Sequence, residues 1–316
     1  MKRLNILIWH IHGSYLNALA RIEHNWYLPI KPGRPEGYIG RGTTFDMPEY
    51  MREVPAELVR DLPLDLVICQ TPKNYCEDRL DILSAEQRRL PMIYLEHNTP
   101  KPHACDTRHP IDDPEVLLVH VTHYNQLMWD NGRTPTIVIE HSVAIDPDIR
   151  YNGRRERGIT VVNGMQKRPR ISGYDLFLQA REKLPLDAAG METELFDGLG
   201  DIPYRDLHRF IADYRFLFSP MRYTSLPLAV IEAMTIGMPV VALATTELPT
   251  VISHGENGYI SCKIDELIEH MRFLLTDREE AARLGRNARA LAQERFSLDR
   301  FVRDWNKAFA LITPSA

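Results

Sequence analysis

The sequence predicts an α/β protein made of two doubly wound domains, each built on a parallel sheet. Its 316 residues are enough for about two domains of ordinary size. Short apolar runs typical of buried strands alternate with amphipathic stretches typical of helices. This alternation starts again after Asp146-Pro147-Asp148, whose turn-forming residues favour a linker. We therefore expect domains over 1–148 and 149–298 that face a cleft, with ligands at the carboxyl ends of the strands.

The first half contains five expected strands. Apolar runs predict them over Asn5–His12, Asp65–Cys69, Met92–Glu96, Val116–Val121 and Thr136–Ile139. The connections between them are polar or helical, as at Ser84–Leu90 and Tyr124–Asp130. The stretch from Pro29 to Pro48 is rich in Pro and Gly and has no apolar period, so we expect a functional or mobile loop there.

The second half repeats this pattern. We expect strands over Ile159–Val162, Glu194–Phe196, Arg215–Ser219 and Pro239–Ala244. We expect helices over Tyr174–Lys183 and Pro227–Met234, near Asp277 and from about Asp299. Thr276 and Glu279 have the spacing of a capping box before the third of these helices. The last helix places Phe301, Trp305, Ala308 and Ile312 on one apolar face.

Composition excludes several classes of protein. The net charge is -5, with 44% hydrophobic and 26% charged residues, which fits a soluble globular protein rather than a disordered chain or a nucleic-acid binder. The apolar runs fall short of the roughly 20 residues of a membrane span. The four cysteines are scattered, which favours reduced thiols over a disulfide framework or zinc site. The basic and apolar start runs into a glycine turn without a small-residue cleavage site, so we interpret it as a first strand. We expect a cytoplasmic protein.

The most informative residue is an acid inside an apolar helix. Glu232 lies in the run Leu228–Met234, whose apolar residues cover every side of a helix and predict burial all round. A buried carboxylate needs hydrogen-bond donors. Either a ligand's hydroxyl groups or a core Arg or Tyr can supply them. Thr224 and Ser225 precede Pro227, at a helix start whose free amides suit an anion such as a diphosphate.

The residues around Glu232 also resemble a known family. Glu232-Ala233-Met234, Gly237-Met238-Pro239-Val240-Val241 and Gly255-Glu256-Asn257-Gly258 are similar in order and spacing to the donor-site signature of family 4 retaining GT-B glycosyltransferases. This family is also called glycosyl transferases group 1. The family's pattern has an earlier Glu eight residues before the second, and Thr224 stands there in this chain. The resemblance implies a GT-B fold whose final helix, 299–316, packs back on the first domain.

The resemblance implies roles for individual residues. Glu232 would bind the ribose, and Thr224, Ser225 and Leu226 would lie near the transferred sugar. The loop after Gly164 departs from the family's phosphate-binding Arg and Lys, so Lys167, Arg168 or Arg170 would serve the diphosphate instead. Arg222 is a further candidate. In the first domain, His97 would position donor or acceptor, beside the turn at His12, Gly13 and Ser14.

The resemblance also implies the chemistry. The donor would be a UDP- or GDP-sugar, with no permanently bound cofactor, and the acceptor a glycan, a lipid-linked glycan or another glycoconjugate. A lipid-linked acceptor would bring the protein to the inner membrane surface, with the 29–48 loop as a contact. Family members are typically metal-independent. His10 and His12 share a strand face without a convincing third ligand, and we interpret Asp146-Pro147-Asp148 as linker rather than a metal-binding DxD.

Two alternatives to a glycosyltransferase stay open. One is another GT-B enzyme, such as a nucleotide-sugar epimerase, which needs no acceptor. The other is a non-catalytic subunit that binds a partner glycosyltransferase, because a fold does not imply a function. The missing first Glu and the irregular basic loop keep the second alternative open.

Overall fold

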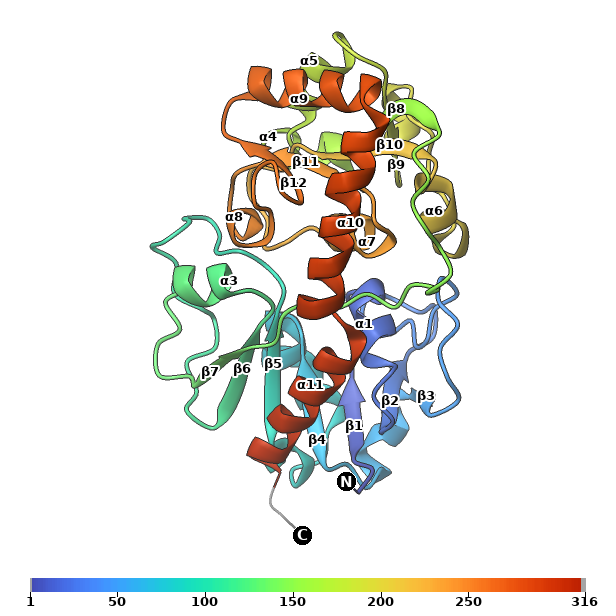
Figure 1. The fold of residues 1–316 in the computed structure, drawn as a ribbon. Coiled ribbons are helices and arrows are strands. Elements are labelled where there is room, and N and C mark those ends of the chain that lie inside the picture. Colours follow the sequence, from blue (N-terminus) through green and yellow to red (C-terminus); the bar gives the residue numbers. More distant parts are fainter. Residues whose placement is uncertain (1, 314–316) are drawn as a thin grey trace. The chain divides into compact units, whose positions relative to one another are not determined.

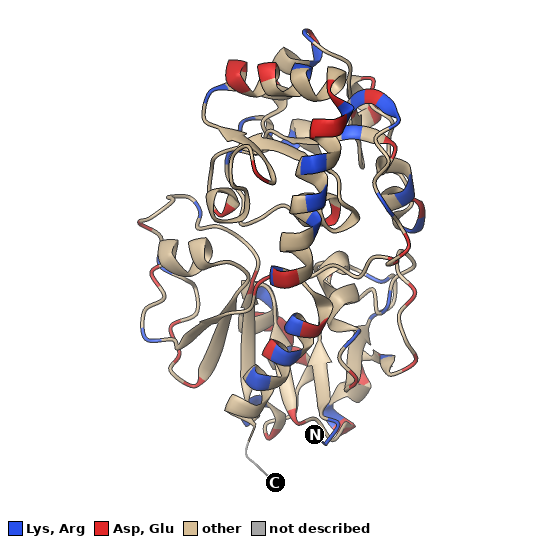
Figure 2. Cartoon of the chain, in the orientation of Figure 1, with Lys and Arg blue, Asp and Glu red and all other residues tan. Residues whose placement is uncertain are grey.

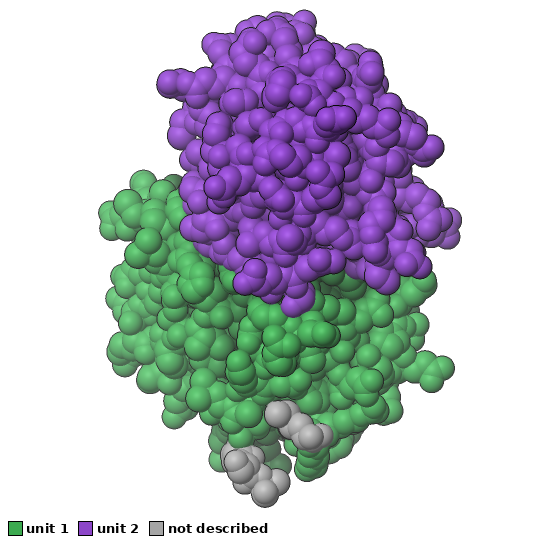
Figure 3. Space-filling view, viewed as in Figure 1, with its two compact units in different colours: residues 1–144, 298–316 green, residues 145–297 purple. Residues whose placement is uncertain are grey.

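The computed structural model describes residues 2–313, and within that range the strands form two separate parallel sheets (Figure 1). The chain divides into two units, which Figure 3 colours separately. Unit 1 comprises residues 1–144 and 298–316, and unit 2 comprises residues 145–297. The unit boundary falls just before Asp146-Pro147-Asp148. None of the helices described is long and apolar enough to cross a membrane.

The sheet of unit 1 has seven strands in the described range, all paired in parallel. Their order across the sheet is β3 (Met51–Pro55), β2 (Asn25–Ile30), β1 (Asn5–Ile8), β4 (Leu66–Cys69), β5 (Met92–Glu96), β6 (Val116–His120) and β7 (Thr136–Val138). Alternate residues of β1 enter opposite cores, with Ile6 and Ile8 in one and Leu7 in the other. The sheet is therefore buried on both faces, as parallel sheets usually are.

The helices of unit 1 are α1 (Gly13–Leu19), α2 (Arg79–Ile82), α3 (His123–Met128) and α11 (Leu298–Ile312). The apolar face of α11 packs into the same core as α1, where Trp305 Nε1 donates to Tyr15 Oη over 3.2 Å. Phe301, Trp305 and Ala308 are buried as the spacing predicts. Residues 314–316 of the expected last helix lie outside the described residues.

The sheet of unit 2 has five parallel strands in the described range. Their order is β12 (Gly258–Ser261), β11 (Val240–Leu243), β10 (Tyr214–Ser219), β8 (Arg155–Val161) and β9 (Leu186–Ala189). Its helices are α4 (Pro169–Ser172), α5 (Tyr174–Arg181), α6 (Tyr204–Ile211), α7 (Leu228–Ile236), α8 (Leu248–Val251), α9 (Ile264–Thr276) and α10 (Arg278–Arg295). Acidic and basic residues are interspersed along α10 (Figure 2).

Three local expectations are wrong. The strand predicted over Glu194–Phe196 is a 3-10 turn, Thr193–Phe196, and the strand of this region is β9, whose Ala-rich sequence has a weak strand signal. The capping box at Thr276 is displaced by one residue. Thr276 ends α9, and the Asp277 carboxylate accepts from Glu280 N to begin α10.

The third wrong expectation concerns the first strand, which ends at Ile8 instead of His12, with α1 beginning at Gly13. The sequence also gives no sign of β2 and β3. Pro29 lies inside β2, and its missing N–H is tolerated because β1 pairs with β2 only as far as Tyr27. Residues 31–48 form a loop, as expected, whereas Pro29 and Ile30 belong to β2.

Candidate functional site

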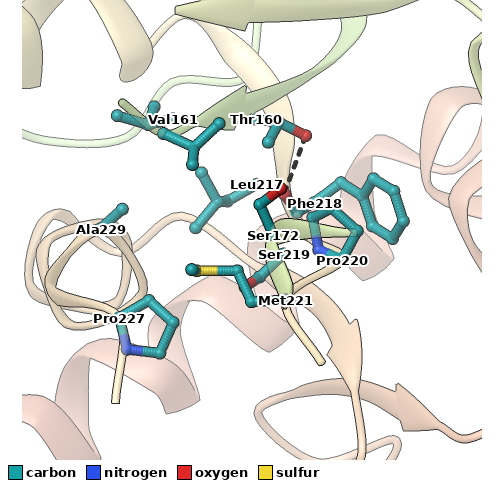
Figure 4. Close-up of a pocket in the computed structure, with 11 residues that line it drawn as sticks. Thr160, Val161, Ser172, Leu217, Phe218, Ser219, Pro220, Met221, Pro227 and Ala229 are labelled. Carbon is teal, nitrogen blue, oxygen red and sulfur yellow. Dashed lines mark hydrogen bonds between the residues drawn. The ribbon is translucent and has the colours of Figure 1, made fainter. Parts of the chain in front are cut away.

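Unit 2 has a pocket where its strand order reverses. From β8 the chain moves outward to β9 and then returns to place β10 on the other side of β8. The carboxyl ends of β8 and β10 at this reversal are the usual ligand position in doubly wound sheets. A small pocket lies there, lined by Thr160 and Val161 of β8, Phe218 and Ser219 of β10, and Pro227 and Ala229 at the start of α7 (Figure 4). The buried Thr160 hydroxyl donates to Phe218 O over 2.9 Å and ties the two strand ends together.

Glu232 lies on α7, and only 4% of its surface is exposed. Tyr204 Oη, at the start of α6, donates to Glu232 Oε1 over 3.1 Å, and His208 Nε2 lies 3.6 Å from the same oxygen. A core tyrosine is thus one donor to the carboxylate. No described residue donates a hydrogen bond to Oε2. Since buried carboxylate oxygens need donors, Oε2 is the atom available to a ligand.

The start of α7 is open rather than capped by a side chain. Pro227 is the N-cap residue, and it forms no side-chain capping hydrogen bond. Ser225 and Leu226 are buried, and Thr224 is half-buried. Val230 N donates to Pro227 O over 3.0 Å, whereas the Leu228 and Ala229 amides and the positive dipole end of α7 remain available to an anion in the described structure.

The basic loop after β8 holds most of its cations in ion pairs. Gly164 adopts a left-handed conformation with φ +56° and begins a 3-10 turn, Met165–Lys167. Lys167 Nζ lies 2.5 Å from Glu192 Oε1, and Arg170 Nη1 lies 2.7 Å from Asp175 Oδ2. Arg168 is exposed, and its guanidinium forms no ion pair or hydrogen bond with any described residue. Of these three cations, Arg168 is therefore the one that can take an anion without losing a partner.

Asp175 connects the loop to Arg222. Arg222 donates to both carboxylate oxygens of Asp175, over 2.6 and 2.8 Å. Mainly because of these bonds, the pKa of Asp175 falls to about 2. Ser172, beside this network, donates its hydroxyl to Met165 O over 2.7 Å. The hydroxyl of Ser172 therefore stabilises the loop backbone instead of pointing to a ligand.

Unit 1 has a second polar cluster, also at the carboxyl ends of central strands. The strand order of unit 1 reverses between β1 and β4. Gln70 follows β4, and its Oε1 lies 2.9 Å from Nε2 of His97, which follows β5. The rings of His12 and His97 have centroids 4.1 Å apart, and the rings of Tyr15 and His97 are nearly perpendicular, with centroids 4.8 Å apart. The structure thus brings His97 and His12 together, next to the start of α1 at Gly13 and Ser14.

The two histidines of the first strand region separate. His10 Nδ1 is bonded to Gly40 O over 2.7 Å, within the 29–48 loop, while His12 joins the cluster around His97. In residues 2–313 no group of three or more His, Cys, Asp or Glu side chains is arranged to hold a metal ion.

Sequence reasoning missed three residues of these clusters: Gln70, Tyr204 and His208. They come from segments distant along the chain from His97 and Glu232, and no local spacing connects them. The one available signal was that a carboxylate predicted to be buried needs a donor, which directs the search to Tyr and His on neighbouring helices.

Part of the sequence matches a known protein family. Residues 179–291 match the family model described as "Glycosyl transferases group 1", a segment that contains Glu232, Tyr204 and the start of α7. An uncharacterized glycosyltransferase of Haemophilus influenzae is 27% identical over 90 residues, which are 27% of this chain and 25% of that protein. The chain thus matches about a quarter of the length of this curated relative.

Solved structures share the fold over almost the whole chain. The structure of Anabaena HepE with UDP has a TM-score of 0.71 and 15% identity, covering 98% of this chain and 100% of that one. Sucrose-phosphate synthase from Thermosynechococcus elongatus has a TM-score of 0.70 and 14% identity, covering 98% and 99%. The two parallel-sheet α/β units are those of GT-B glycosyltransferase structures.

Proposed function

We propose that this chain is a retaining glycosyltransferase that takes a sugar from a nucleotide-diphosphate sugar. The observation that carries the proposal is Glu232, a buried carboxylate with one oxygen free, close to the open start of α7 in unit 2. A buried acceptor beside a set of free amides suits a ligand that carries both hydroxyl and phosphate groups. A nucleoside diphosphate is such a ligand.

The proposed donor site assigns one group to each part of the nucleotide. Glu232 Oε2 accepts a hydrogen bond from a ribose hydroxyl, while Tyr204 donates one to Oε1. The diphosphate lies at the start of α7, near Thr224, Ser225 and Leu226. Charge that develops on the leaving diphosphate is stabilised by these amides and by cations of the loop after Gly164. Arg168 can bind the diphosphate without losing a partner. Lys167 and Arg170 would first have to release Glu192 and Asp175, respectively.

The comparisons support the choice of donor to test first. Structures of Anabaena HepE are described in complex with UDP and with UDP-glucose, and the family model covers the Glu232 segment. Because those structures share the fold at low identity, the base and sugar used by this chain stay proposals. UDP-sugars are the first donors to test, followed by GDP-sugars.

Unit 1 is proposed to position the acceptor and the transferred sugar. His97, His12 and the Gly13-Ser14 turn present polar groups at the carboxyl ends of β1 and β5. In the retaining mechanism that the family resemblance implies, the acceptor attacks on the face that the diphosphate leaves, and the diphosphate takes the acceptor's proton. His97 then positions substrate instead of acting as a dedicated base.

Product analysis distinguishes this function from its alternatives. The protein is incubated with UDP- and GDP-sugars, with and without glycan acceptors, and products are identified by mass spectrometry and NMR. Transfer to an acceptor with an unchanged anomeric configuration, undiminished in EDTA, is expected. Conversion of the donor sugar without acceptor would instead identify an epimerase. A lack of turnover and of nucleotide binding would favour the partner-subunit alternative.

The proposed location is the cytoplasm, at the inner membrane surface when the acceptor is lipid-linked. Residues 31–48 of the loop after β2 are the proposed contact. Flotation with vesicles that contain anionic lipid tests this idea, and protein that stays in the aqueous fraction would refute the membrane contact while leaving the transferase proposal intact.

A further inference from the structure

We propose that Gln70 is a positioning residue that presents Nδ1 of His97 to substrate as a hydrogen-bond acceptor. The group that His97 contacts is then a hydrogen-bond donor, such as a sugar hydroxyl, rather than a phosphate oxygen. The inference rests on the proposed function for the identity of the substrate. Its structural part, the protonation pattern of one ring, is testable without any substrate.

A backbone carbonyl fixes the orientation of the Gln70 side chain. Gln70 follows β4, is buried, and has its Nε2 2.6 Å from Trp9 O, which follows β1. Trp9 O is a carbonyl and can only accept, so the NH₂ group of Gln70 must face it. The other end of the amide, Oε1, therefore faces His97 Nε2 at 2.9 Å.

This orientation determines where the imidazole proton lies. An amide oxygen can only accept, so His97 Nε2 must carry the hydrogen that it donates. Burial, assisted by the neighbouring His12 and His141, holds the pKa of His97 well below its usual range. At neutral pH the ring is uncharged with its hydrogen on Nε2, and Nδ1 is left with a lone pair.

The surroundings leave Nδ1 for a ligand. No described residue forms a hydrogen bond with His97 Nδ1. The centroid of the His97 ring lies 4.1 Å from that of His12 and 4.8 Å from that of Tyr15. The His141 ring also lies edge-on to Tyr15, with centroids 5.7 Å apart, and both of its ring nitrogens are buried without a hydrogen-bond partner among the described residues. The titratable neighbours of the His97 ring are thus His12, His141 and Tyr15, and no carboxylate bonds to it.

The chemistry of Nδ1 selects its partner. A neutral acceptor nitrogen binds O–H or N–H groups and is repelled by the lone pairs of an ionised phosphate. Sugar hydroxyls meet this requirement, whereas the diphosphate does not. His97 therefore contributes to recognition of the sugar or the acceptor.

The test is NMR of the full-length protein with ¹⁵N-labelled histidine, with His97 assigned by the signal lost in His97→Ala. We expect a neutral ring at pH 7 with a protected Nε2–H proton. Gln70→Leu should abolish that protection, because the acceptor is gone. Gln70→Glu should raise the pKa of His97, because a carboxylate favours the imidazolium. The matched control is Gln87→Leu, which removes another buried glutamine of unit 1, bonded to Val59 O and Leu62 O, and should leave His97 unchanged.

Two results would overturn the inference: an Nδ1–H tautomer in the wild type, or an Nε2–H signal that survives Gln70→Leu. If Gln87→Leu folds and keeps the His97 signal, neither result can be attributed to the general loss of a buried glutamine.

If sugar transfer is found, Gln70→Leu should lower kcat/KM about two- to tenfold, as expected for one net hydrogen bond, and Gln87→Leu should not. If the tautomer is as predicted but no nucleotide sugar binds, the proposed function fails and the protonation pattern stands.

Discussion

Replacing Gly173 by alanine tests how unit 2 holds the loop after β10 beside the pocket. Gly173 joins α4 to α5 with φ +75°, and a Cβ there would lie 2.0 Å from Pro220 O. A left-handed conformation costs an L residue about 1–2 kcal/mol. The overlap involves backbone atoms that must shift, which costs about 1–3 kcal/mol more. We therefore expect Gly173→Ala to lower the free energy of unfolding of unit 2 by about 2–5 kcal/mol.

The matched control is Gly255→Ala in the same unit. Gly255 has φ +77°, and a Cβ there would meet no described heavy atom within 4 Å, so only the conformational cost of about 1–2 kcal/mol applies. The hydrogen-exchange rates of peptides from β8 and β10 report the stability of unit 2. Tryptophan fluorescence follows unit 1, because Trp9, Trp26, Trp129 and Trp305 all belong to unit 1. Equal losses of protection in the two variants would refute the role assigned to the close approach at Pro220.

Three further variants test other contacts. Buried Arg215 donates to the carbonyls of Gly153, Leu274 and Leu275, so Arg215→Leu should destabilise unit 2 by about 3 kcal/mol, measured as loss of exchange protection in β10. Burial lowers the pKa of His141 to about 3, so the unfolded chain binds more protons than the native one as pH falls below about 6.5. Urea unfolding followed by tryptophan fluorescence should therefore give a lower free energy of unfolding for unit 1 at pH 5 than at pH 7.5. His141 can contribute at most about 1.4 kcal/mol per pH unit to this difference, and His141→Asn should reduce it. Thr246 has φ +51° and a buried hydroxyl that no described residue bonds, so Thr246→Gly should stabilise unit 2 by about 1 kcal/mol. A loss of stability in this variant would contradict the backbone strain inferred at Thr246.

The sequence predicts the central strands well because of how they are buried. β4, β5 and β6 are apolar on both faces and follow from hydrophobic runs, and α7 is apolar all round, with Glu232 buried as expected. The edge strand β3 has only five residues, and its two buried residues, Met51 and Val54, are separated by two exposed ones, so the alternation typical of a strand is absent. A strand such as β9 exists because its neighbour β8 pairs with it, which no local propensity encodes.

The sequence singles out individual candidate residues of the site but not the pairs that they form. Glu232 stands out because a charge in an apolar helix demands a partner. Its donor Tyr204 lies 28 residues earlier, on another helix, and Gln70 lies 27 residues before His97. These pairs form only when the sheets bring strand ends and helices together. The loop cations were expected to be available, yet ion pairs engage Lys167 and Arg170, which depends on Glu192 and Asp175 folding next to them.

Nucleotide binding by wild-type protein and Glu232→Gln is the most direct test of the central claim. Calorimetric titration with UDP and GDP is compared with a thermal-shift assay, in which ligand at about 100 times Kd should add roughly 2.7 kcal/mol. Glu280→Gln is the control, because Tyr259 donates to Glu280 over 2.9 Å as Tyr204 does to Glu232. We expect one nucleoside diphosphate to bind the wild type and the control, with a large loss in Glu232→Gln. Binding unchanged in Glu232→Gln, or no binding to any of the three proteins, would contradict the donor site.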